Sequence, residues 1–287
     1  MRLGVVGMIP KDFVTVNHEH LEAVRALGLT GACFHGASDQ LFDIQTDECK
    51  KVRDVYGEAG MDLPQFGVGF RECLFDHDAE VRAQVVSKIK RGIEVARDLN
   101  AHTCLIRTGS LNPAGSYVPC KENFEPESRV RLIETLKQVA TKAEEEGVTI
   151  VIETHALTIM GSPESNKEII EAVGSDRMGV VMDYVNHFQS MDQVYNSTDR
   201  LNHIYDLMGP ISPVAHCKDI IISPGLVLHI DEEVPGEGEI DMVTALQRWQ
   251  DLYPDGYMLL EHLPNDRYPL AAANVIRICE EAGIEIH

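Results

Sequence analysis

The chain has 287 residues, of which 44% are hydrophobic and 25% charged, and its formal net charge is −21. This composition is close to the average of soluble proteins and excludes a disordered chain, a fibre and a disulfide-stapled miniprotein. The strong negative charge repels phosphate backbones and anionic lipid, which argues against nucleic-acid and membrane-surface partners.

Two features predict a cytoplasmic protein. The first residues lack the charged stretch and long apolar run of a signal peptide, and no apolar run approaches the ~20 residues needed to cross a bilayer. The seven cysteines are scattered without a C-x-x-C pair, as expected of reduced thiols in the cytosol. We therefore expect a cytoplasmic protein without a membrane partner.

Short apolar runs alternate with amphipathic helical stretches eight times along the chain. The apolar runs have the length of buried strands, and between them the spacing of apolar residues changes to the period of a helix. Val81, Val85, Ile89 and Ile93, for example, form one stripe within residues 78–99. The predicted strands lie at residues 2–7, 29–35, 62–68, 102–107, 148–153, 178–183, 212–217 and 256–261.

Alternating strands and helices predict a parallel sheet, which is either an open doubly wound sheet or a closed eight-fold barrel. A doubly wound dinucleotide-binding protein would carry G-x-G-x-x-G directly after its first strand, but Met8, Ile9 and Pro10 stand there. Eight strand–helix units in 287 residues fit the barrel. We predict one α/β domain over residues 1–287, a parallel (β/α) TIM barrel.

Polar residues end the last four predicted strands. Glu153 ends the fifth, Asp183 the sixth and Glu261 the eighth, and His216 lies near the end of the seventh. A single carboxylate at the end of a strand often caps a helix or joins an ion pair. Here, however, each of four successive strand–helix units has one polar residue at or near the end of its strand, so the four should converge at one face of the barrel. Burying such groups is costly unless a cation lies among them. The pattern predicts one divalent ion, Mn²⁺ before Mg²⁺ or Co²⁺.

Further polar residues are predicted to surround this site. His155 follows Glu153 by two positions, so both side chains face one side of a strand, and His155 is a candidate general acid or base. The alternative is a histidine that is hydrogen-bonded at the rim of the barrel. Lys218 is placed to hold an anionic or carbonyl oxygen. The other candidates for binding the substrate are His35, Arg107, Asn186 and His187.

These motifs, in this order, resemble the xylose-isomerase-like TIM-barrel superfamily, and within it the sugar isomerases and epimerases related to tagatose and psicose 3-epimerases. The resemblance is carried by IVIE at 150–153, VVMD at 180–183, AHCKD at 215–219, PGEGEID at 235–241 and LLE at 259–261. It covers nearly the whole chain. It implies that the four strand-end residues bind one metal ion and that Glu153 and Glu261 exchange protons on opposite faces of a metal-stabilised enediolate.

Two positions depart from the pattern of many relatives. Many of them carry a substrate-contacting histidine three positions after the sixth-strand aspartate, whereas Asn186 stands at this position and His187 follows it. His155 adds an imidazole that many epimerases lack. The hydroxyl contact of those relatives is therefore not carried over to this chain.

The sequence thus predicts a metal-dependent enzyme of carbohydrate metabolism, an isomerase or epimerase of a small sugar or oxo-sugar acid. The alternative is a lyase on an oxo-sugar, of the 3-oxo-sugar-acid decarboxylase or C-glycoside deglycosidase type, in which His155 would serve the leaving group. An AP-endonuclease-like enzyme would need several metal ions and a basic surface, and a non-catalytic barrel would not need four intact ligands. A homo-oligomer is compatible with the sequence.

Overall fold

Eight parallel strands close into a barrel in the computed structural model, which describes residues 1–34 and 40–287 in full and only the backbone at 35–36. The hydrogen-bonded order around the barrel is β1–β10–β7–β6–β5–β4–β3–β2. The strands are β1 (Arg2–Val6), β2 (Gly31–Gly36), β3 (Gln65–Val68), β4 (Thr103–Arg107), β5 (Thr149–Glu153), β6 (Met178–Met182), β7 (Val214–Cys217) and β10 (Tyr257–Leu260). The predicted parallel barrel is confirmed, and each predicted strand ends within a few residues of the observed one.

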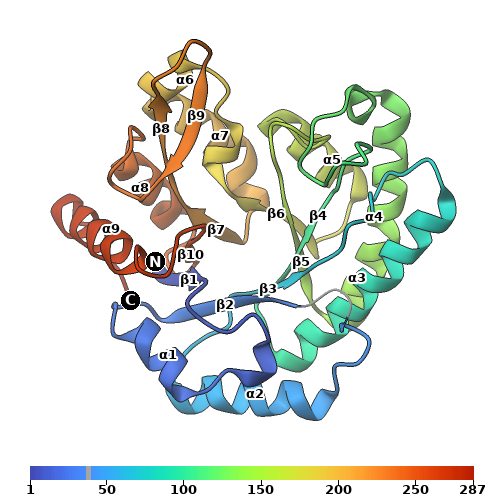
Figure 1. Ribbon diagram of the computed structural model, residues 1–287, viewed down its shortest axis with the longest axis horizontal. Coiled ribbons are helices and arrows are strands. Elements are labelled where there is room, and N and C mark those ends of the chain that lie inside the picture. The colour runs from blue at the N-terminus through green and yellow to red at the C-terminus, as the bar shows by residue number, and fades with distance from the viewer. Residues whose placement is uncertain (37–39) are drawn as a thin grey trace.

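Helices connect the strands and surround the barrel (Figure 1). They are α1 (His18–Arg25), α2 (Thr46–Ala59), α3 (Ala79–Leu99), α4 (Pro126–Glu146), α5 (Pro163–Val173), α6 (Met191–Tyr195), α7 (Ser197–Met208), α8 (Met242–Leu252) and α9 (Tyr268–Ala282). Short 3-10 helices lie at η1 (Phe13–Thr15), η2 (Lys121–Phe124), η3 (Tyr184–His187) and η4 (Gly209–Ile211). In the described part of the chain, no helix is both long and apolar enough to cross a membrane.

Helix α3 packs closely against the barrel. Its buried residues Val85, Ile89 and Ile93 repeat with the predicted helical period. Gly92 is buried as well, and a Cβ atom at this position would overlap with Val68 Cγ2 of β3. The glycine therefore lets the helix backbone approach the strand more closely than a larger residue would allow.

A two-stranded antiparallel hairpin interrupts the eight-fold pattern after β7. Its strands, β8 (Asp219–Ser223) and β9 (His229–Glu233), form a separate sheet that stands beside α6 at the top of Figure 1. No apolar pattern in the sequence indicated this hairpin. Its second strand is mostly charged and partly or fully exposed, so it lacks the apolar run by which the barrel strands were recognised.

Asp219 connects the hairpin to the PGEGEID motif that follows it through hydrogen bonds. Its buried carboxylate accepts hydrogen bonds from the backbone N–H groups of Ile220, Gly236, Gly238 and Ile240, at 2.9 to 3.1 Å. A Cβ atom at Gly238 would overlap with the Asp219 carboxylate, so the motif requires glycine there. The motif is therefore a loop that wraps around a carboxylate and holds the hairpin at the end of β7.

The packing of α3 predicts opposite effects for two glycine substitutions. Gly92→Ala should lower the free energy of unfolding by about 1–3 kcal/mol, because the new methyl group has to displace Val68. Gly57→Ala in α2 is the matched control, since Gly57 is exposed and nothing lies within 4 Å of its added Cβ. It should raise the free energy of unfolding by about 0.5–1 kcal/mol. Denaturant unfolding measures both, and equal effects would contradict the close packing.

Candidate metal centre

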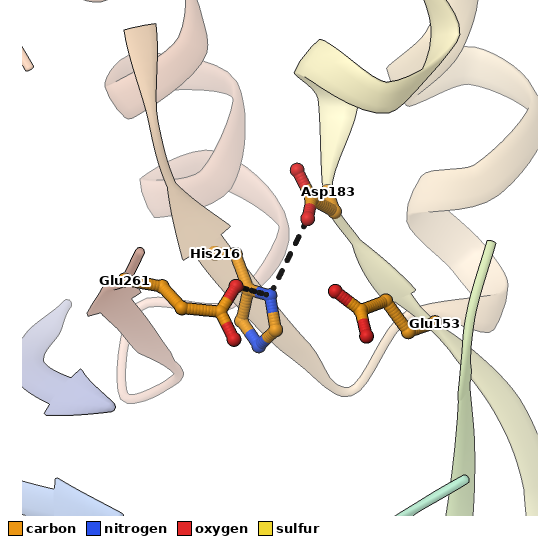
Figure 2. Close-up of side chains that lie close together, drawn as sticks. All are labelled: Glu153, Asp183, His216 and Glu261. Carbon is orange, nitrogen blue, oxygen red and sulfur yellow. Dashed lines mark ion pairs between the residues drawn. The ribbon is translucent and has the colours of Figure 1, made fainter. Parts of the chain in front are cut away.

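The four residues predicted to bind a metal lie together at the C-terminal ends of four adjacent strands. Glu153 is the last residue of β5, His216 lies in β7, and Asp183 and Glu261 directly follow β6 and β10. One ligand atom from each residue lies within 4.8 Å of the ligand atoms of the others. Figure 2 shows the four side chains pointing toward one another from their separate strands. The structure thus brings together the side chains that the sequence predicted to converge.

The atoms of this cluster are buried and short of partners. All four residues are at most 2% exposed. Glu153 Oε1, Asp183 Oδ1 and Glu261 Oε1 are buried and have no hydrogen-bond partner among the described residues, while His216 Nδ1 and Glu261 Oε2 form an ion pair without hydrogen-bond geometry. A buried polar atom without a partner costs about 1–3 kcal/mol. Converging oxygen and nitrogen donors of this kind are the ligand set of a divalent cation, so the residues present fit a metal ion.

Lys218 places an ammonium group against the same carboxylates. Its Nζ atom lies 2.8 Å from Asp183 Oδ2 and 3.1 Å from Glu261 Oε2. Burial alone would lower the pKa of Lys218, but the two carboxylates raise it well above its usual value. Burial alone would raise the pKa of Asp183, but Lys218 and His216 hold it below its usual range. Lys218, a predicted substrate contact, is therefore a direct neighbour of the cluster.

His216 faces two carboxylates with one ring nitrogen. Its Nδ1 atom lies 2.7 Å from Glu261 Oε2 and 3.5 Å from Asp183 Oδ2, as the dashed lines in Figure 2 show. Burial alone would lower the pKa of His216, but Glu261 and Asp183 raise it to about 10. Burial would raise the pKa of Glu261, yet His216 and Lys218 lower it well below its usual range. The groups keep one another charged, and a metal ion would replace the proton on Nδ1.

Arg107 and His155 both approach Glu153. Arg107 Nε donates to Glu153 Oε2 at 2.8 Å, and His155 Nε2 lies 3.9 Å from Glu153 Oε1. The Tyr117 ring packs on both, at 4.7 Å from the His155 ring and 5.2 Å from the guanidinium carbon of Arg107. Burial lowers the pKa of His155, so its imidazole is neutral at pH 7. No sequence pattern indicated Tyr117, because it lies in an irregular loop after β4.

Three further residues were predicted to bind the substrate, and no side-chain hydrogen bond between them and the cluster is observed in the described part of the chain. His187 is fully buried and its Nε2 atom shares a hydrogen bond of 3.0 Å with Thr154 Oγ1, which stabilises the turn after β5 rather than adding a donor to the cluster. Asn186 Nδ2 is buried and has no partner among the described residues. His35 belongs to β2, but its side chain lies outside the described part of the chain.

Three polar residues near the cluster were not identified from the sequence. Gln65 Oε1 lies 3.1 Å from His216 Nε2, while His262 Nδ1 and Glu232 Oε1 lie 3.2 and 3.5 Å from Lys218 Nζ. Gln65 carried a usable signal, because it is a polar residue within a predicted buried strand. Glu232 carried none, since its position depends on the unpredicted hairpin.

The chain belongs to the family described as xylose isomerase-like TIM barrel, which it matches over residues 21–279. This match covers most of the chain and confirms the resemblance drawn from the strand-end motifs. No curated protein sequence matches the chain.

Solved structures with the same fold include several enzymes. A D-psicose 3-epimerase structure determined with D-fructose has 16% identity and a TM-score of 0.74, with 99% of this chain and 100% of that chain covered. A xylose isomerase-like TIM barrel protein from Mycobacterium smegmatis in complex with magnesium has 16% identity and a TM-score of 0.71, with coverages of 98% and 96%. The probable 3-DHS dehydratase AsbF from Bacillus anthracis has 12% identity and a TM-score of 0.72, with coverages of 96% and 98%. At sequence identities of 12% to 16%, the structural similarity shows that these proteins share a fold with this chain.

The buried His187 should make stability depend on pH. Burial lowers the pKa of His187 from 6.5 to about 4. Between these values the unfolded chain binds a proton that the folded protein excludes. The free energy of unfolding should therefore fall by about 3 kcal/mol as the pH decreases from about 6.5 to about 4. Denaturant unfolding across this range measures the fall.

The contribution of His187 is isolated by substitution. In His187→Gln an amide can still form a hydrogen bond with Thr154 but does not titrate, so the fall in stability over this range should be smaller. His203→Gln, which replaces an exposed histidine paired with Glu164, is the control. An unchanged pH dependence in His187→Gln would assign the effect to other groups.

Proposed function

We propose that this protein is a divalent-metal-dependent isomerase or epimerase of a small sugar or oxo-sugar acid. Glu153, Asp183, His216 and Glu261 are the proposed ligands of one ion. The observation that carries the proposal is the buried cluster of three carboxylates and an imidazole, in which several of the converging ligand atoms lack hydrogen-bond partners among the described residues. Family membership and the fold shared with a D-psicose 3-epimerase support this reaction class.

The ligand set favours Mn²⁺, with Mg²⁺ and Co²⁺ as alternatives, because three hard carboxylates accompany one imidazole. The magnesium complex of the Mycobacterium smegmatis protein supports an ion of this kind. When bound, a divalent ion acts as a Lewis acid that polarises carbonyl and hydroxyl oxygens of a substrate. Glu153, Asp183, His216 and Glu261 would hold the ion, and a divalent ion that takes more than four ligands would also accept those substrate oxygens.

Proton transfer is the task of Glu153, Glu261 and His155 in this proposal. The two glutamates lie on the outer strands of the four that hold the cluster, so they approach a bound substrate from two sides. One carboxylate takes the carbon-bound proton, and the other returns a proton on the opposite face. Arg107 donates a hydrogen bond to Glu153 Oε2, so Oε1 is the carboxylate oxygen that remains free to take part in proton transfer. The Nε2 atom of the neutral His155 lies 3.9 Å from Oε1, which is too far for a hydrogen bond, so a proton would pass between them through one water molecule.

Other residues orient the substrate and shield it from water. The Lys218 ammonium stabilises negative charge that develops on a substrate oxygen beside the cluster. Asn186 Nδ2 is an unused buried donor for a substrate hydroxyl. Tyr117 covers Arg107 and His155 and so limits the access of water to Glu153. These contacts suit a small polyhydroxy compound with a carbonyl group.

A lyase acting on an oxo-sugar is the second candidate. His155 favours it, because this imidazole is neutral and its Nε2 atom is buried without a hydrogen bond among the described residues, as a group that serves a leaving atom would be. The fold shared with a probable 3-DHS dehydratase agrees with such chemistry. Both candidates use the same metal ligands, so they differ in the role of His155.

A cytoplasmic location is part of the proposal. All seven cysteines are free, and six of them are buried. Reduced thiols are typical of proteins in the cytosol. The net charge of −21 supports a small-molecule substrate rather than a nucleic acid.

The proposed ligands predict the metal content of variants. The wild-type protein should bind about one divalent ion per chain, a chelator should abolish activity and Mn²⁺ should restore it. Glu261→Gln and Asp183→Asn should weaken Mn²⁺ binding by more than ~100-fold, because losing a ligand costs more than losing an outer partner of a ligand. Metal analysis and a panel of keto- and oxo-sugars measure both properties.

A surface variant is the control for these substitutions. Glu168→Gln replaces an exposed carboxylate paired with Arg129 and should bind Mn²⁺ as the wild type does. A wild-type protein that binds no divalent ion, or cluster variants that bind it normally, would contradict the proposal.

His155→Ala distinguishes the two candidate reactions. In an isomerase the glutamates supply the acid and the base, so the loss of His155 should lower kcat about 10-fold, as for one lost hydrogen bond. In a lyase the same change should cost about 10²–10⁴-fold. Turnover in D₂O, followed by NMR, identifies carbon-bound proton exchange or bond cleavage. The variant has to retain the wild-type Mn²⁺ affinity, because a variant that loses metal reports on the ligands instead.

A further inference from the structure

We propose that Gln65 is a positioning residue that decides which nitrogen of His216 is presented to the metal. This inference rests on the proposed function of the cluster as a metal site. Gln65 lies in β3 and His216 in β7, which face each other across the barrel with three strands between them on either side. The residue therefore links the metal centre to a half of the barrel that supplies none of the four ligands.

The contact crosses the interior of the barrel. Gln65 is 1% exposed, and its Oε1 atom lies 3.1 Å from His216 Nε2. Nδ1, the other ring nitrogen, faces Glu261 and Asp183. The imidazole therefore lies between the amide of Gln65, which contacts Nε2, and the proposed ligands Glu261 and Asp183, which contact Nδ1.

An amide is unexpected at this place. Every other barrel strand contributes an apolar residue to one buried cluster, which contains Val6, Cys33, Leu105, Val151, Val181, Val214, Tyr257 and Leu259. Several of these residues precede a site residue by two positions, so they face the same way and form the floor beneath the metal centre. A polar group in such a layer is costly unless it is hydrogen-bonded. The bond to His216 Nε2 is the contact that offsets this cost.

The chemistry of the amide oxygen selects the tautomer. A carbonyl oxygen only accepts, so Gln65 Oε1 requires the hydrogen of a neutral His216 ring to be on Nε2. The charged ring of the metal-free protein has to lose one hydrogen before it can bind a metal ion, and the hydrogen that Gln65 accepts stays on Nε2. The lone pair then forms on Nδ1, the nitrogen that faces the cluster. A metal ion binds an imidazole through its lone pair, and a hydrogen on Nδ1 would block this bond. Gln65 therefore prepares His216 as a ligand without touching the ion.

The first test needs no variant. The protein is labelled with [¹⁵N]histidine and loaded with Mg²⁺, and ¹⁵N–¹H NMR locates the proton on the His216 ring. The proposal expects the proton on Nε2. A proton on Nδ1 would overturn it, because Gln65 would then present its NH₂ group to Nε2 and favour the opposite tautomer.

The second test measures Mn²⁺ affinity by titration. Gln65→Leu removes the acceptor and should weaken Mn²⁺ binding ~10–100-fold, the range for losing an outer partner of a histidine ligand. Saturating Mn²⁺ should then recover kcat, because the residue acts through the ligand. Gln65→Glu keeps an acceptor oxygen and should bind Mn²⁺ at least as tightly as the wild type. Gln65→Leu with wild-type affinity would overturn the proposal.

A matched control separates this effect from a general loosening of the barrel. Thr103 is buried in the neighbouring strand β4, where its hydroxyl donates to the Pro64 carbonyl at 2.8 Å. Thr103→Val should leave Mn²⁺ affinity unchanged, and an equal loss in this variant and in Gln65→Leu would overturn the role of Gln65. A wild-type protein without Mn²⁺ affinity would instead reject the metal centre itself. If Gln65→Leu does not fold, the NMR measurement and Gln65→Glu decide the question.

Discussion

The burial of three carboxylates at one face of the barrel is the constraint on which the site depends. Negative charges that are removed from water destabilise the fold unless positive groups lie close to them. His216, Lys218 and Arg107 meet this need, each at 2.7 or 2.8 Å from a different carboxylate. The arrangement still leaves Glu153 Oε1, Asp183 Oδ1 and Glu261 Oε1 without a hydrogen bond among the described residues, and a cation could bind among these oxygen atoms.

The two glutamates of the cluster are not equivalent. Glu153 shares one oxygen with Arg107 and has a neutral imidazole near the other, whereas Glu261 lies beside the cationic groups of His216 and Lys218. An epimerase needs acid–base groups on two faces of the substrate, and these two glutamates would meet the two faces with different neighbours. The same asymmetry would let His155 assist a leaving group, which is why both an isomerase and a lyase are proposed for this site.

Contacts between distant segments complete the site. The hairpin after β7 brings Glu232 to Lys218, and the buried carboxylate of Asp219 holds this hairpin in place. Gln65 reaches His216 across the barrel. The closed barrel makes these contacts compatible, since its strands are held in register on both sides and their ends cannot shift independently.

The sequence by itself determined the eight strands and the four residues of the cluster. Both depend on local signals, namely the change of apolar period along the chain and the polar residue that ends a buried strand. Only the tertiary structure decided that His187 turns to Thr154, that Arg107 pairs with Glu153 and that Gln65 supports His216. The direction of a side chain after a turn and its partners from other strands depend on packing between segments far apart in the chain, which no local pattern records.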